Sequence, residues 1–205
     1  MNVIALNGSP NIGGNTYLSI VAFSEEMHVQ GFDTEVLHIG DGQIPGCVAC
    51  RGCAKTGQCV VPDEGFAKLS EKLLDADGVF LAAPVYFGTI PGQAKSFLDR
   101  FFFQFLKAGK MRHKVGASAA ILRRSGGSAA IDDLSRFFVA SDMILAGQCI
   151  IHGAMPGEIL QDVEGLAHIR RLARNMAWVL KMQDATRADI APPPFVERQF
   201  MNFIR

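Results

Sequence analysis

Residues 2–16 read NVIALNGSPNIGGNT, and this stretch decides the fold. Its first six residues form a short, mainly apolar run, which predicts a buried strand over 2–7 that ends at Gly8-Ser9-Pro10. Asn15-Thr16 then offers a helix cap, and apolar residues at helical spacing continue the helix until Gly31. A strand, a loop and a helix in this order predict the first unit of an alternating β-α fold.

The same alternation continues along the chain. Further strands are predicted at 33–39, 78–83, 114–122 and 148–152, and further helices at 66–74, 93–106, 128–141 and 162–181. The strands are nearly all apolar, as strands buried on both faces are, which indicates a parallel sheet covered by helices. We therefore predict an α/β fold, a three-layer sandwich with a five-stranded parallel sheet. It occupies residues 1–183 as one domain, with a cysteine-rich insertion at 41–63.

The final segment, 184–205, is predicted to be a C-terminal arm. It holds Pro192-Pro193-Pro194 and then three phenylalanines, Phe195, Phe200 and Phe203. Burying a large apolar side chain is worth about 1.5–3 kcal/mol, so these rings are expected to pack on this domain or against a second subunit.

The composition excludes several classes of protein. The chain has 205 residues, and its 20 Lys+Arg against 20 Asp+Glu give a formal net charge of zero. A sequence-independent nucleic-acid binder needs a positive surface, so that class is disfavoured. No apolar run approaches the roughly 20 residues of a membrane helix, and Met1-Asn2-Val3 lacks the basic lead of a secretory signal. We expect a cytoplasmic protein without a membrane or nucleic-acid partner.

The loop between the first strand and the first helix has the composition of a phosphate site. It combines glycines with the side-chain donors Ser9, Asn15 and Thr16, and a helix N-terminus offers unpaired N–H groups and a positive dipole end. No Walker triplet and no Gly-x-Gly-x-x-Gly fingerprint is present, which disfavours ATP and dinucleotide binding at this loop. The alternative is that Asn15 or Thr16 only caps the helix.

A second loop, Ala83-Pro84-Val85-Tyr86-Phe87-Gly88, follows the third strand. In parallel sheets, ligands lie at the carboxyl ends of strands, so this loop is expected near the first one. Its aromatic side chains could stack on a planar ligand, or they could be ordinary core residues.

Together the two loops, continued by Lys95-Ser96-Phe97-Leu98-Asp99-Arg100, resemble the NADPH-dependent FMN reductase family over residues 1–180. The resemblance implies a flavodoxin-like fold, a noncovalent FMN, NAD(P)H as a possible co-substrate and a homo-oligomer. The first loop would hold the FMN phosphate through Ser9, Asn15 and Thr16, and Pro10, Asn11 and Gly14 complete that loop. The isoalloxazine edge would lie along Pro84, Val85, Tyr86, Phe87 and Gly88.

A third loop, Arg123-Arg124-Ser125-Gly126-Gly127, follows the fourth strand and would complete this pocket. Its candidate cofactor contacts are Arg123, Ser125 and Gly126. The two arginines depart from the small residues usual in the family. They are either a solvated pair, or a positive charge that favours reduced, anionic flavin or the phosphate of a pyridine nucleotide.

Four of the five cysteines, Cys47, Cys50, Cys53 and Cys59, fall within 13 residues. Structural zinc sites more often use two separated pairs, whereas three thiols at successive spacings of three resemble ferredoxin-type ligation. The stretch also resembles the iron–sulfur flavoprotein branch of the family, which implies a [4Fe-4S] cluster. Bare redox thiols or a disulfide, and zinc, remain alternatives. Cys149 lies in a predicted strand and is expected in the core.

These features favour an FMN-dependent oxidoreductase that moves electrons from NAD(P)H to a small acceptor such as a quinone or flavin. The flavin carries the chemistry, so no catalytic acid or base is required, and none is evident. One alternative is an iron–sulfur electron carrier that takes single electrons from a ferredoxin. Another, of a different class, is a non-catalytic module that binds FMN or another phosphorylated ligand.

Overall fold

A computed structural model describes residues 1–39, 44–106 and 108–196. Five strands alternate with helices along the chain, as the sequence predicts. In chain order the elements are β1 (Val3–Asn7), α1 (Asn15–Val29), β2 (Thr34–His38), α2 (Cys53–Thr56), α3 (Glu64–Asp75), β3 (Gly78–Pro84), α4 (Gly92–Leu106), β4 (Val115–Leu122), α5 (Gly127–Ala140), β5 (Ile144–His152), the 3₁₀ turn η1 (Glu158–Gln161) and α6 (Val163–Thr186).

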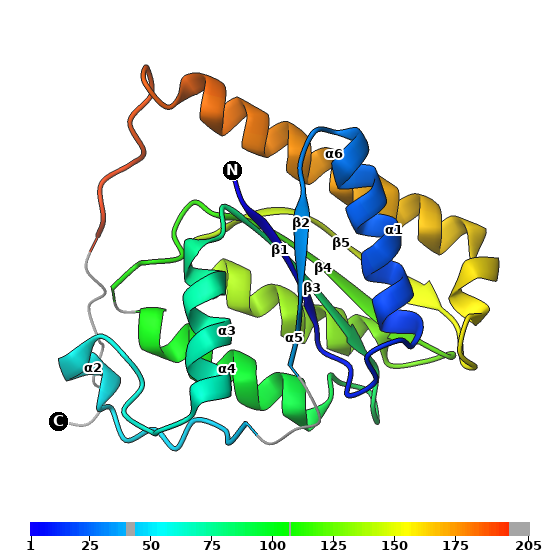
Figure 1. The fold of residues 1–205 in the computed structure, drawn as a ribbon, viewed down its shortest axis with the longest axis horizontal. Coiled ribbons are helices and arrows are strands. Elements are labelled where there is room, and N and C mark those ends of the chain that lie inside the picture. Colours follow the sequence, from blue (N-terminus) through cyan, green and yellow to red (C-terminus); the bar gives the residue numbers. More distant parts are fainter. Residues whose placement is uncertain (40–43, 107, 197–205) are drawn as a thin grey trace, which may run out of the picture.

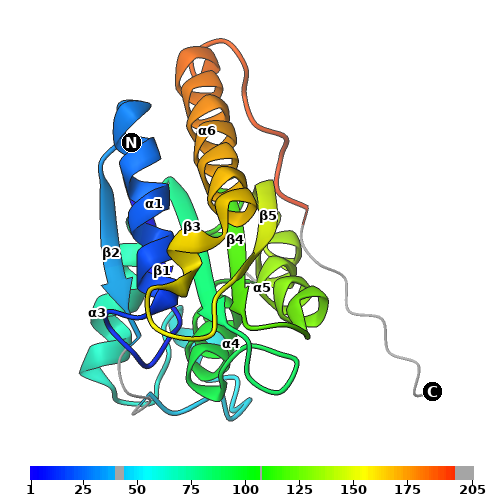
Figure 2. The ribbon, with the colours of Figure 1, turned by 90° about the vertical axis from the view of Figure 1, so that its right-hand side faces the viewer.

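The sheet is parallel throughout, with strand order β2-β1-β3-β4-β5. Helices α1 and α6 cover one face, and α3, α4 and α5 cover the other (Figures 1 and 2). The prediction of a three-layer α/β sandwich is therefore confirmed. The strand order reverses between β1 and β3, so the loops after these two strands flank the switch point at which such folds bind ligands.

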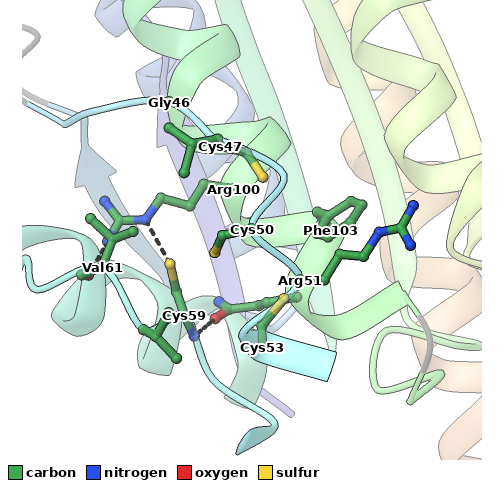
Figure 3. A pocket seen from close by; sticks show the side chains of 12 residues that line it. Gly46, Cys47, Cys50, Arg51, Cys53, Cys59, Val61, Arg100 and Phe103 are labelled. Atoms are coloured by element: carbon green, nitrogen blue, oxygen red, sulfur yellow. Dashed lines mark hydrogen bonds between the residues drawn. The ribbon is translucent and has the colours of Figure 1, made fainter. Parts of the chain in front are cut away.

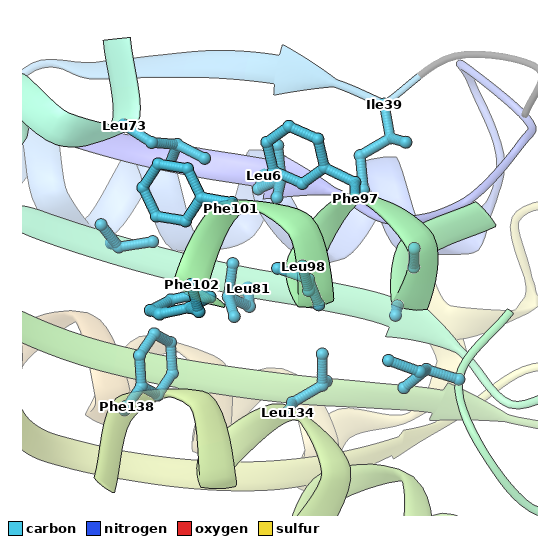
Figure 4. Close-up of a cluster of buried hydrophobic side chains, with 14 of the residues drawn as sticks. Leu6, Ile39, Leu73, Leu81, Phe97, Leu98, Phe101, Phe102, Leu134 and Phe138 are labelled. Atoms are coloured by element: carbon cyan, nitrogen blue, oxygen red, sulfur yellow. The ribbon is translucent and has the colours of Figure 1, made fainter. Parts of the chain in front are cut away.

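The core is split by the sheet because side chains alternate along each strand. Val3 and Ala5 of β1 face the α1–α6 layer, whereas Ile4 and Leu6 face the α3–α5 layer. The second layer is rich in aromatic rings, and Figure 4 shows Phe97 and Phe101 of α4 packed beside Leu6. Both faces are dry, which explains why the strands are nearly all apolar.

Several element boundaries differ from the predictions. β5 begins at Ile144, four residues before the predicted start at 148. The prediction began too late because Gly147, at a register irregularity of the strand, interrupts the apolar pattern. α6 runs past 181 to Thr186, and the short helix α2 was not predicted. The predicted cap of α1 is wrong as well: the capping residue is Gly14, and Asn15 is the first helical residue.

The C-terminal arm leaves α6 as an extended segment. Arg112 donates hydrogen bonds to the carbonyl oxygens of Pro193 and Pro194 at 3.1 and 3.3 Å, and its guanidinium lies over the Phe195 ring. Phe200, Phe203 and the first residues of the cysteine-rich insertion, 41–43, lie outside the described residues. Among the described helices, none is long and apolar enough to cross a membrane.

Candidate functional site

The loops after β1, β3 and β4 meet at the carboxyl edge of the sheet. The Gly8 N–H donates to the Ala82 carbonyl oxygen at 2.8 Å, and the Val85 N–H donates to that of Ile121 at 2.8 Å. A Cβ on Gly8 would lie 3.0 Å from the Cβ of Ala83, so glycine is what lets the first loop lie against β3. The first two predicted flavin loops are thereby tied to neighbouring strands.

Helix α1 keeps its N-terminal donors free. Gly14 provides no side-chain cap, and within the described residues the N–H groups of Asn15, Thr16 and Tyr17 have no acceptor. By contrast, α3 and α6 are capped by the carboxylates of Asp63 and Asp162. Because Gly14 has no side chain to cap α1, the unpaired N–H groups and the positive dipole end of this helix are available to an anion.

The predicted phosphate loop is held by hydrogen bonds among its own residues. The Asn7 Oδ1 accepts the Ser9 N–H at 3.0 Å, and the Ser9 Oγ accepts the Asn11 N–H at 3.1 Å. Thr16 is buried in the first turn of α1, while Asn11 and Gly14 lie nearer the surface. Asn7 closes this turn, and the sequence analysis did not single it out, although Asn is a typical turn-forming residue.

Asn15 has a partner that its sequence position does not reveal. Its Nδ2 donates to the Met155 carbonyl oxygen at 2.9 Å, and its Oδ1 accepts the Gly157 N–H at 2.8 Å. Glu158 accepts the N–H groups of Ala154 and Met155, both at 2.8 Å. These bonds lower the pKa of Glu158, and the one from Met155 has the larger effect. The positive charge of Arg123 lowers this pKa further. Asn15 thus holds the loop after β5 against α1, and Glu158 ties that loop to itself.

The second predicted loop exposes both of its aromatic residues, Tyr86 and Phe87, to solvent. Tyr86 and Thr89 exchange two backbone hydrogen bonds across a tight turn, and the intervening Phe87 and Gly88 have φ of 50° and 88°. A left-handed conformation costs a bulky residue about 1–2 kcal/mol, yet Phe87 is fully exposed and gains no core contact for it. Phe87 is therefore not a core residue, and its ring is free to contact a ligand.

The third loop touches the second through glycine. A Cβ on Gly126, which has φ of 87°, would lie 2.6 Å from the Cα of Gly88. Arg123, Arg124 and Ser125 are exposed beside this contact, so the two arginines are solvated in the chain as it stands. The arrangement gives a pocket edge made of backbone, next to two exposed positive charges.

The four clustered cysteines line one small pocket against α4 (Figure 3). Cys59 is anchored there: its Sγ accepts a hydrogen bond from the Nε of Arg100 at 3.1 Å, and its N–H donates to the Oε1 of Gln104 at 2.8 Å. Arg100 is only 2% exposed and also donates to Asp63 at 2.7 Å. Cys47 and Cys50 are exposed instead.

The backbone around Cys50 has an unusual conformation. Ala49 and Arg51 have φ of 53° and 58°, and Gly52 follows with φ of −57°. Successive residues of opposite hand turn their N–H groups to one side, a nest that binds anions and iron–sulfur sulfides. No hydrogen bond within the described residues uses the N–H groups of residues 48–53.

The thiols are near one another but not gathered around one point. Burial raises the pKa of the Cys53 thiol, and the neighbouring Cys59, Cys47 and Cys50 raise it further by charge repulsion. Yet among the described residues no group of three or more His, Cys, Asp or Glu is placed to hold a metal ion. The pocket encloses ≈ 20 Å³, about the room that one water needs. Four thiols are a suitable set of ligands for a cluster, but the distances between them in this structure do not suit one.

Comparison with known proteins shows the family of the chain. Residues 1–155 match the NADPH-dependent FMN reductase family. The chain belongs to that family. An iron–sulfur flavoprotein of Methanocaldococcus jannaschii is 32% identical over 193 residues, which are 89% of this chain and 98% of the relative, so the predicted branch is confirmed too.

Solved structures agree on the fold. A flavodoxin, WrbA-like protein of Agrobacterium tumefaciens superposes with a TM-score of 0.60 at 16% identity, covering 88% of this chain and 98% of that one. RosB with bound 8-demethyl-8-formylriboflavin-5′-phosphate gives a TM-score of 0.74 at 16% identity, covering 100% and 93%. The fold is flavodoxin-like, and family membership makes the chain an FMN-dependent oxidoreductase.

Proposed function

We propose that the chain binds FMN at the three loops and moves electrons from NAD(P)H to a small acceptor such as a quinone or a free flavin. The observation that carries this proposal is the uncapped N-terminus of α1 beside a loop already folded by Asn7 and Ser9. The N–H groups of residues 15–17 and the Thr16 hydroxyl would hold the phosphate.

The loops after β3 and β4 would position the ring system. Phe87 offers an exposed aromatic face, and the contact between Gly88 and Gly126 brings backbone close to a planar ligand. Bound FMN supplies hydride and single-electron chemistry, so this chain contributes orientation and charge rather than an acid or base. The exposed Arg123 and Arg124 are the cations nearest to this contact in sequence, and they would bind the phosphates of the nucleotide.

We further propose that Cys47, Cys50, Cys53 and Cys59 hold a [4Fe-4S] cluster, which supplies single-electron transfer when bound. Four thiols on one loop, the nest at Arg51-Gly52 and the Arg100 N–H directed at the Cys59 sulfur support this. The cysteine segment and the flavin loops lie at the same end of the molecule (Figures 1 and 2).

The cysteines also favour a second candidate function, a carrier that accepts single electrons from a ferredoxin-like donor. Hydride transfer from a nicotinamide to FMN needs no cluster, whereas an iron–sulfur cluster exchanges electrons one at a time and suits a one-electron partner. The related protein of M. jannaschii is named an iron–sulfur flavoprotein, which supports the same alternative.

Purification and heating test the flavin proposal. The protein is expected to be yellow and to release FMN when it is heated. A colourless protein that also takes up no FMN in a titration contradicts the assignment of the three loops.

Anaerobic stopped-flow spectroscopy separates the two routes. Bleaching of FMN is followed after mixing with NADPH, with NADH and with reduced ferredoxin. Fast bleaching by a nicotinamide supports the reductase, and bleaching by ferredoxin alone makes the chain a carrier. Arg124→Gln should slow reduction by NADPH more than by NADH if the loop binds the 2′-phosphate. Arg136→Gln, which removes an exposed arginine of α5 outside the loop, is the matched control.

A further inference from the structure

The two edges of the sheet are built differently. The edge strand β2 has five residues, and its Glu35 pairs with Lys72 of α3. The opposite edge strand, β5, has nine residues that read ILAGQCIIH, without an acidic residue, a lysine, an arginine or a proline. Sheets usually protect exposed edges with short strands, charges or prolines, so a long uncharged edge calls for a covering partner.

Helix α6 protects only the ends of this edge. The Asn175 Nδ2 donates to the Ala146 carbonyl oxygen at 3.3 Å, and the Asp162 Oδ2 accepts the His152 N–H at 2.7 Å. Because backbone groups alternate in direction along a strand, those of Gln148 and Ile150 point outward like that of His152. Within the described residues they have no hydrogen-bond partner.

A groove of ≈ 390 Å³ runs along this unprotected middle. Its floor is the edge of β5 at Gln148 and Ile150, and Ile131 of α5 forms one wall. The other wall is α6, which presents Glu164, His168 and Arg171. Figure 2 shows β5 at the margin of the sheet, with α5 and α6 on either side of it.

We propose that a second copy of this chain fills the groove by pairing its own β5 antiparallel to this one, about a two-fold axis beside Cys149. In this register Gln148 faces Ile150 of the partner subunit, and the outward backbone groups of both strands form four hydrogen bonds. The two sheets would then continue as one.

The charges on α6 are self-complementary in this arrangement. α6 runs antiparallel to β5, since Asp162 contacts His152 and Asn175 contacts Ala146. Glu164 therefore lies toward one end of the groove and Arg171 toward the other. The two-fold axis exchanges the ends, so Glu164 of each copy faces Arg171 of the other. This complementarity favours a second copy over an unrelated extended peptide.

The first test is the mass in solution, measured by light scattering at micromolar concentration. The native chain is expected as a dimer of about twice 22.2 kDa, or as a multiple of that dimer, and a 22.2 kDa monomer overturns the proposal. Gln148→Pro removes the outward N–H, a loss that an edge strand tolerates, so it should halve the mass. Gln148→Ala keeps that N–H and should not. Both variants also remove the hydrogen bond that Ser135 donates to the Gln148 Oε1, so the two differ only at the backbone.

A charge reversal on α6 tests the register without altering β5. Glu164→Arg alone and Arg171→Glu alone should each weaken dimerisation at least about tenfold, because each places like charges together. The double variant restores both pairs in the reversed sense and should recover the native affinity. Both side chains are exposed, so the fold is expected to survive. Single variants with unchanged dimerisation, or a double variant no better than they are, would refute this interface.

Discussion

The flavin loops and the cysteine segment differ in how completely the chain organises them. Each flavin loop is fixed by neighbouring strands, by local hydrogen bonds such as Ser9–Asn11, or by a glycine contact such as Gly126–Gly88. In the cysteine segment only Cys59 is firmly held, whereas Cys47 and Cys50 remain exposed. A backbone-built pocket can form from the sheet alone, whereas four cysteines bind a metal only as thiolates, so their site is completed when the metal binds and displaces the protons.

The largest effect is expected from breaking the cysteine segment. Cys50→Ala or Cys53→Ala should abolish iron binding while FMN content stays at the native level, because the two regions lie on different loops. Iron and acid-labile sulfide, measured after anaerobic reconstitution, are expected at about four atoms of each per native chain. Cys149→Ala is the matched control, since that thiol is buried in the core and should leave the iron count unchanged. Native protein that takes up no iron under these conditions contradicts the cluster.

Arg100 should matter to the cysteine segment only. Its guanidinium joins Cys59, Asp63 and the Val61 carbonyl oxygen, and it lies 3.9 Å from the centre of the Phe66 ring. Arg100→Gln removes the charge and should weaken iron binding about 10- to 100-fold, the usual effect of losing a partner of a metal ligand. In loaded protein, loss of the hydrogen bond to the Cys59 sulfur should also shift the reduction potential.

Arg100→Lys retains the positive charge and is expected to recover part of both properties. Thermal unfolding of each variant separates a ligand effect from a folding defect, because a half-buried Asp63 that has lost the Arg100 charge also destabilises the fold. If both variants keep native iron affinity and potential, Arg100 is structural only.

Most of the fold could be predicted because it follows from periodicity. Apolar strands and amphipathic helices specify the β-α alternation, and α4 was predicted to within one residue of its start at Gly92. The errors fall where one residue changes the local pattern. Gly147 interrupts the apolar pattern of β5, so the prediction missed the first half of that strand. The polar pair Asn15-Thr16 suggested a helix cap, but the capping residue is Gly14.

The site was less predictable because it depends on contacts between distant residues. Motifs located the three loops and the four cysteines, but not the bond from Arg100 to Cys59 across 41 positions. Likewise nothing near Asn15 in the sequence indicates its bonds to Met155 and Gly157, 140 and 142 residues away. Hydrogen bonds between residues so far apart in the sequence become visible only in the folded structure.

A smaller effect is expected from disturbing the backbone contact in the flavin region. Gly126→Ala places a Cβ where the Cα of Gly88 lies within 2.6 Å, at a positive φ that alanine disfavours. Displacing the turn that carries Phe87 should weaken FMN binding about tenfold, which corresponds to about 1.4 kcal/mol. Titration followed by flavin fluorescence measures this, and Ser128→Ala, at an exposed position of α5, should bind FMN normally. Iron content should not change, and a parallel loss of iron would mean that the two regions are coupled.

The smallest effect concerns Asn15, for which the structure offers two roles. The resemblance implies a direct contact with the FMN phosphate, whereas the observed hydrogen bonds hold the loop after β5. In the second role Asn15→Ala loosens that loop and should weaken FMN binding only a few-fold, since a neutral hydrogen bond contributes about 1 kcal/mol.

Riboflavin, which lacks the phosphate, distinguishes the two roles. If Asn15 acts through the loop, Asn15→Ala weakens FMN and riboflavin by the same factor. If its side chain contacts the phosphate, FMN alone loses affinity, by about tenfold or more, because hydrogen bonds to charged groups contribute about 1.5–3 kcal/mol. Thr16→Val is the comparison variant: it removes the buried hydroxyl of the first turn and should affect FMN alone. Equal losses for Asn15 with selective losses for Thr16 would place phosphate recognition in the first turn of α1 and leave Asn15 as a clamp on the neighbouring loop.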